Sequence, residues 1–155
     1  MAEDEIDFAV AAYRDDGRWQ VAELSPHLGE DFDELSQALS RFPSDVGVLG
    51  LVSTNDDFFV IVRRSGTRVR AMVSDLTAAA DWPLADGVAE LLDLADPDDD
   101  DDPQAGGDLD LLSDLGMSGS ELGDLCDDDE LYPEDVLRDV ADRLGFGAAF
   151  ESVIG

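Results

Sequence analysis

Lysine is absent from the sequence, and only nine arginines offset 39 aspartates and glutamates, so the formal net charge is −30 in 155 residues. Direct binding to DNA or RNA is therefore disfavoured, because phosphates would meet a field of the wrong sign that a Debye length of about 8 Å does not fully screen. A chain with this charge is expected to bind a protein with a basic surface.

Histidine and cysteine are also scarce, with His27 and Cys126 the single examples of each. Two such side chains cannot supply the nitrogen and sulfur ligands of a typical zinc site, and one cysteine cannot form an internal disulfide. Cys126 lies between Asp124 and residues 127–129, whose negative charge disfavours the thiolate that a nucleophile requires. We therefore expect Cys126 to be a small apolar residue and His27 to be a loop residue.

Motifs that mark common reaction centres are missing, including G-x-S-x-G, the P-loop and G-x-G-x-x-G. Asp96, Asp98 and Asp100 have the spacing that begins an EF-hand loop, but the sixth position is Asp101 instead of glycine and the twelfth is Gly107 instead of glutamate. We predict a protein that is not an enzyme and uses no metal or cofactor. A small enzyme with a dispersed Ser-His-Asp site stays open as an alternative.

No stretch of eighteen uninterrupted apolar residues occurs in the sequence. The first residues, MAEDEID, are acidic, whereas a secretory signal begins with basic residues and continues with apolar ones. These two features predict a cytoplasmic protein without a membrane contact.

Residues 1–95 are predicted to form an α+β domain with an antiparallel sheet of about five strands. Residues 8–24 contain two strands on either side of Asp16-Gly17, a pair that favours a hairpin turn. A helix is expected at residues 32–42, because its apolar residues recur at helical spacing, Asp31 and Glu34 have capping-box spacing, and Pro43 follows.

A three-stranded meander follows, with strands at residues 46–53, 58–63 and 67–73. The first two are apolar on both faces, so helices must cover the sheet on both sides. Residues 74–80 and 83–95 are predicted to supply further helical cover.

An acidic, flexible linker is predicted at residues 96–107, where five consecutive aspartates repel one another. Residues 108–155 then form a helical C-terminal region, which glycines divide into short helices before a firm amphipathic helix runs from Pro133 to its stop at Gly145. A helical region this short must pack either on the first domain or on another protein.

Three groups of residues are candidates for partner binding. The first is an arginine cluster that serves either as a counter-charge for the chain's own acids, such as residues 98–102, or as a docking patch. The second is an acidic group within residues 96–132, a segment with 15 acids and no basic residue. The third is an apolar face of the last long helix, which either anchors a partner or packs within the chain. In order, the groups are Arg63, Arg64, Arg68 and Arg70; Asp127, Asp128, Asp129 and Glu130; and Val136, Leu137 and Val140.

Several separated segments, spread over essentially the whole chain, are similar to one protein family. They are residues 8–13 (FAVAAY), 32–35 (FDEL), 44–52 (SDVGVLGLV), 71–75 (AMVSD), 82–83 (WP), 132–137 (YPEDVL) and 144–146 (LGF). Through them the chain resembles the actinobacterial tRNA adenosine deaminase-associated proteins. The resemblance implies association with a tRNA-editing deaminase, and it brings no catalytic residues.

The chain is not the deaminase itself, which needs His-x-Glu and Pro-Cys-x-x-Cys to hold zinc and move protons. Here His27 is followed by Leu28 and Gly29, and Cys126 has no second cysteine. We predict a non-catalytic partner that binds or regulates the deaminase, either in the basic tRNA groove or beside it. The alternatives are a nucleic-acid-mimicking inhibitor of another basic protein and a homo-oligomeric structural protein.

Overall fold

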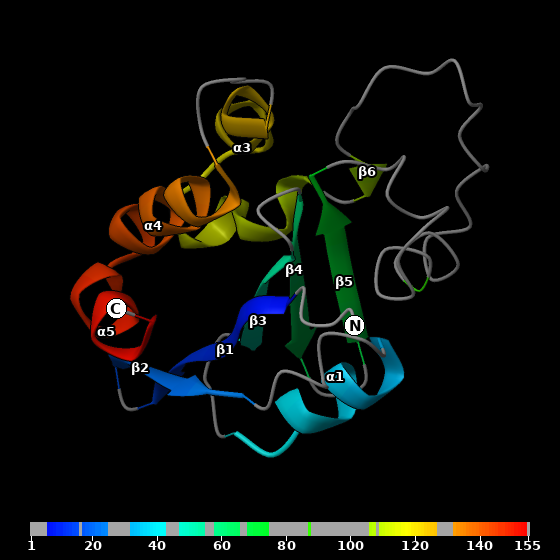
Figure 1. Ribbon diagram of the computed structural model, residues 1–155, viewed down its shortest axis with the longest axis vertical. Helices are drawn as coiled ribbons and strands as arrows, with labels where there is room; N and C mark the ends of the chain where they lie inside the picture. Colours follow the sequence, from blue (N-terminus) through cyan, green and yellow to red (C-terminus); the bar gives the residue numbers. More distant parts are fainter. Residues whose placement is uncertain are drawn as a thin grey trace.

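The computed structural model describes residues 6–15, 17–24, 32–42, 47–54, 58–65, 68–74, 87, 106–107, 109–126 and 132–154. Its described strands form a single antiparallel sheet in the order β2-β1-β3-β4-β5-β6, and helices lie on both faces of that sheet (Figure 1). The predicted α+β class, with five main antiparallel strands in a hairpin and a meander, is confirmed.

The hairpin consists of β1 (Ile6–Asp15) and β2 (Arg18–Glu23). It turns at Gly17, whose φ of 77° is one that residues with a side chain rarely adopt. β1 pairs with β3 on its other side, so the hairpin forms one end of the sheet.

The meander consists of β3 (Val48–Thr54), β4 (Phe58–Ser65) and β5 (Arg68–Val73). Alternate residues of β4 pack in two different hydrophobic cores. Val60 and Val62 lie on one face of the sheet, and Phe59 and Ile61 lie on the other. The prediction that these central strands are covered on both faces is confirmed.

Helix α1 (Phe32–Leu39) covers one face of the sheet. Its Leu35 and Leu39 are fully buried against that face, and Gly50 of β3 lets them approach, since a Cβ there would lie 3.1 Å from Leu39 Cδ1. The predicted cap Asp31 and the predicted helices at 74–95 lie outside the described residues, apart from Ser74 and a helical Gly87.

The opposite face carries η3 (Leu109–Leu115), α3 (Gly119–Cys126), α4 (Pro133–Leu144) and α5 (Gly147–Ile154), here called the helical layer. Figure 1 shows α3, α4 and α5 on the side of the sheet away from α1. One core joins the layer to the strands. Aromatic rings also join the layer to the hairpin: Trp19 and Phe146, which precedes α5, are centred 4.9 Å apart, and Phe8 and Phe150 of α5 are centred 5.6 Å apart. The predicted helical region therefore packs on the sheet.

Helix α4 has the predicted limits. It begins at Pro133 and is followed by Gly145, whose φ of 108° is left-handed and whose N–H donates to the Ala141 carbonyl at 2.9 Å. Because this stop requires a positive φ, glycine is favoured there.

The predicted linker, residues 96–107, ends in two residues that the structure describes. Gly106 and Gly107 form β6, which pairs with Val73 and Met72 at the edge of β5. Two glycines have low strand propensity and no side chains to pattern, so the pairing depends on backbone groups that β5 exposes. Residues 96–105 lie outside the described part.

Candidate protein-interaction surface

Arg63 of β4 is buried, with 6% of its surface exposed. Its Nη1 donates to the Leu111 carbonyl at 2.7 Å and to Asp114 Oδ1 at 2.6 Å, and its Nη2 donates to Asp114 Oδ2 at 3.0 Å. This two-bond fork between a guanidinium and a carboxylate ties β4 to η3. Arg63 therefore acts as an internal counter-charge, and its acid is Asp114.

The charge of Asp114 also offsets the repulsion between two arginines within the sheet. Arg63 lies directly opposite Arg70 in the β4–β5 ladder, where two like charges would repel. The hydrogen bond from Arg63 lowers the pKa of Asp114, with smaller contributions from the charges of Arg63 and Arg70, while burial opposes them. Asp114 is thus held ionised beside the two arginines.

The other two arginines of the predicted cluster are placed differently. Arg64 follows Arg63 in the strand, so its side chain lies on the opposite face, where Nη1 donates to the Ser36 carbonyl at 3.1 Å and to Ser36 Oγ at 3.0 Å. Arg68 is exposed at the start of β5, and Arg70 is half-buried. The four arginines are therefore divided between both faces of the sheet.

The predicted apolar anchor on α4 is buried. Val136 is 2% exposed, and Leu137 and Val140 are 0% exposed, within the core that joins the helical layer to the sheet. Packing within the chain, the alternative for this face, is what the structure shows, and these side chains are out of reach of a partner. Asp127, Asp128, Asp129 and Glu130 lie outside the described residues.

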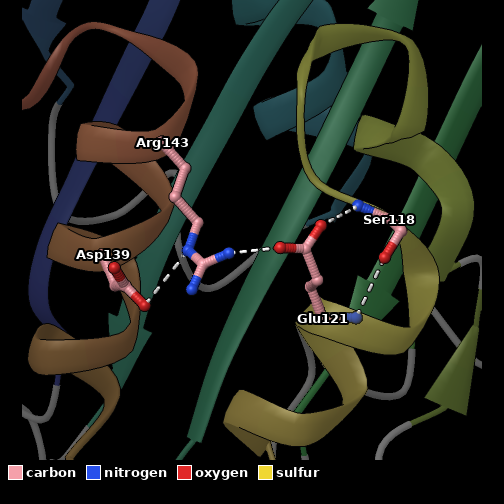
Figure 2. A network of polar contacts seen from close by, with 4 residues as sticks. All are labelled: Ser118, Glu121, Asp139 and Arg143. Atoms are coloured by element: carbon pink, nitrogen blue, oxygen red, sulfur yellow. Dashed lines mark hydrogen bonds and ion pairs between the residues drawn. The ribbon is translucent and has the colours of Figure 1, made fainter.

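A polar network joins α3 to α4 (Figure 2). The Ser118 N–H donates to Glu121 Oε1 at 3.0 Å and the Glu121 N–H donates to Ser118 Oγ at 3.2 Å, a reciprocal cap for α3. Arg143 of α4 binds the other oxygen of Glu121, and its Nε lies 3.5 Å from Asp139 Oδ2. The hydrogen bonds from Ser118 are the largest cause of the lowered pKa of Glu121, and Arg143 adds to it.

Acidic residues are concentrated in the helical layer. Its described residues include nine acids and two arginines, whereas residues 6–74, where described, include five acids and seven arginines. Seven of the nine acids are exposed, and Glu134 and Asp139 are half-buried. The outer surface of the layer is therefore suited to contact a basic surface.

In the described part of the chain, no group of three or more His, Cys, Asp and Glu side chains could hold a metal ion. Cys126 is half-buried against the core, and His27 lies outside the described residues. None of the described helices is long and apolar enough to cross a membrane.

A family model for Rv3753c-like tRNA adenosine deaminase-associated proteins matches residues 7–147. The chain belongs to this family. The chain is also similar to Protein Rv3753c of Mycobacterium tuberculosis (strain ATCC 25618 / H37Rv), to which it is 37% identical over 150 residues, 95% of this chain and 87% of that protein. No solved structure matches the chain. The resemblance inferred from the sequence segments is confirmed, and the family's description is that of an associated protein.

Several residues that make contacts in the structure were not identified from the sequence. Ser118 and Glu121 have the spacing of a capping box, so that signal was present. Asp114 has no such signal, because its contact with Arg63 spans 51 positions and depends on the tertiary fold. Tyr132, which is 64% exposed at the start of α4, belongs to one of the segments similar to the family, and no pattern in the sequence indicates its exposure.

Proposed function

We propose that this protein is a non-catalytic, acidic partner that binds a tRNA adenosine deaminase in the cytoplasm and regulates it by contact. The observation that carries the proposal is the net charge of −30 in a family described as deaminase-associated. The exposed acids of the helical layer supply a suitable surface.

The physical basis lies in what a tRNA-binding enzyme must present. A groove that meets phosphates is basic, so a strongly anionic protein can compete with tRNA for the groove or dock beside it. Opposite charges also steer the two proteins together and raise their association rate at low ionic strength. Asp127, Asp128, Asp129 and Glu130 would add to this charge.

A nucleic-acid-mimicking inhibitor of a different basic protein is the second candidate. The absence of lysine and the run of five aspartates at residues 98–102 favour it, because both make the chain polyanionic without specifying a partner. The two candidates differ in selectivity, since a mimic would bind several nucleic-acid-binding proteins and show no preference for the deaminase.

Co-purification of the tagged protein from its native cell, at low and at moderate salt, separates these candidates. The proposal predicts that the tRNA adenosine deaminase is enriched at low salt and still detected at moderate salt. A mimic predicts a mixture of basic proteins that is lost at moderate salt. If another protein is enriched and the deaminase never appears, the proposed function is wrong.

A further inference from the structure

Tyr132 carries an exposed aromatic side chain at the N-terminal end of α4. It is the residue before α4, the N-cap position, where Ser, Thr, Asp and Asn are preferred because their oxygens accept from the first turn. In the described part of the chain, the Tyr132 side chain makes no capping hydrogen bond. Among the large apolar side chains of the described residues, that of Tyr132 is exposed, at 64%.

The backbone of Tyr132 is nevertheless held firmly. Its N–H donates to Asp135 Oδ2 at 3.2 Å, and Pro133, which follows it, is buried as the first residue of α4. A residue before proline is restricted to extended conformations, and Tyr132 has φ −85° and ψ 161°. An aromatic side chain on so restricted a backbone can be bound at a low cost in conformational entropy.

The surroundings of Tyr132 indicate the chemistry of its partner. In the first turn of α4, Asp135 is exposed and carries negative charge, whereas Glu134 is half-buried and pairs with Arg138 at 2.7 Å. An exposed aromatic ring beside the Asp135 carboxylate suits arginine and lysine, whose cationic group can contact the ring face while the acid balances its charge.

We propose that Tyr132 is the aromatic anchor of the surface that contacts the tRNA adenosine deaminase, and that its ring binds an arginine or lysine side chain of that enzyme. The inference depends on the proposed function and adds the place of contact, the N-terminal end of α4. The buried apolar face of the same helix cannot serve as that anchor, since Leu137 and Val140 are 0% exposed.

The test compares variants of the full chain for binding to the purified tRNA adenosine deaminase of the same organism. Tyr132→Ser removes the ring but introduces a favoured N-cap residue, so its thermal unfolding midpoint should equal or exceed that of the wild type. Its affinity should fall at least tenfold. Tyr132→Phe keeps the ring and should stay within about threefold of the wild type. Gln37→Ser, an exposed change on α1, is the control and should bind like the wild type.

The possible results separate this inference from the function on which it depends. If the wild type binds and Tyr132→Ser binds equally well, the contact is elsewhere and the inference is overturned. If Gln37→Ser loses affinity as Tyr132→Ser does, the loss is not specific to the Tyr132 ring, and the inference is contradicted as well. If the wild type itself does not bind the deaminase, the proposed function is wrong, and the inference that depends on it is wrong too.

Discussion

Arg63 and Arg64 are adjacent residues with separate structural roles. Because successive side chains of a strand point to opposite faces, Arg63 reaches η3 on one side of the sheet and Arg64 reaches α1 on the other. The predicted strand ended at residue 63, so the division of the arginine cluster follows only from β4 continuing through Arg64 to Ser65. The sequence could not identify Asp114 as the acid that pairs with Arg63, since distant pairs are set by the packing of whole elements.

Replacement of Arg63 by alanine should lower the free energy of unfolding by about 2–3 kcal/mol, because the change leaves the Leu111 carbonyl and Asp114 without their donor and removes a buried side-chain stem. Chemical denaturation measures this loss. Arg68→Ala is the matched control, since Arg68 is exposed on the neighbouring strand and its replacement should change stability by less than about 0.5 kcal/mol. Equal effects of the two changes would contradict the assigned role of Arg63.

The pair should also make stability depend on pH in a defined direction. The folded-state pKa of Asp114 is lowered from its ordinary value of 3.8, so its contribution is present above that value and is lost as the pH falls through the lowered pKa. At neutral pH, Asp114→Asn should cost about 1–2 kcal/mol, a modest figure because this carboxylate is 59% exposed.

Denaturant titrations of wild type and Asp114→Asn over a range of pH measure this dependence. The difference between the two proteins should shrink below about pH 4 and vanish at still lower pH. A difference that stays constant over the whole acidic range would show that the ionised carboxylate is not what stabilises the pair.

At the scale of elements, the strands and helices with regular patterns were predictable and the irregular ones were not. Alternating or continuous apolar residues identified β1 to β5, and the spacing between Pro133 and Gly145 identified α4. β6 was not predicted, because Gly106 and Gly107 carry no side chains whose pattern could indicate a strand. Its existence depends on the neighbouring edge of β5.

The cap of α3 gives a prediction at this scale. Ser118→Ala should destabilise the protein by about 1 kcal/mol, because the N–H of Glu121 loses its acceptor at the exposed start of a short helix. Ser120→Ala is the matched control, since Ser120 is exposed within the same helix, where alanine is the better helix former. Thermal unfolding of both variants measures the difference, and an equal response at the two positions would exclude a capping role for Ser118.

At the scale of the whole molecule, the amphipathic pattern of α4 indicated that one face is buried but not what covers it. Either another protein or the chain's own sheet could bury Val136, Leu137 and Val140, and only the assembled core shows that it is the sheet. The charge was fully visible in the sequence, whereas the concentration of described acids on the helical layer required the fold.

A net charge of −30 should oppose the compact state through self-repulsion. Raising sodium chloride from about 0.02 M to about 0.5 M should therefore raise the unfolding midpoint by several degrees at neutral pH, because salt screens that repulsion. The rise should be smaller near pH 4, where ordinary carboxyl groups are about half protonated. A midpoint that falls with added salt at neutral pH would mean that attractive ion pairs, such as Arg63 with Asp114, outweigh the repulsion.

The most direct test of the central claim is a calorimetric titration of the purified tRNA adenosine deaminase with this protein, at about 0.05 M and about 0.3 M salt. We predict saturable binding at the lower salt and a dissociation constant at least tenfold weaker at the higher salt, because the contact is made between opposite charges. The absence of binding at the lower salt, where attraction between opposite charges is strongest, would contradict the account.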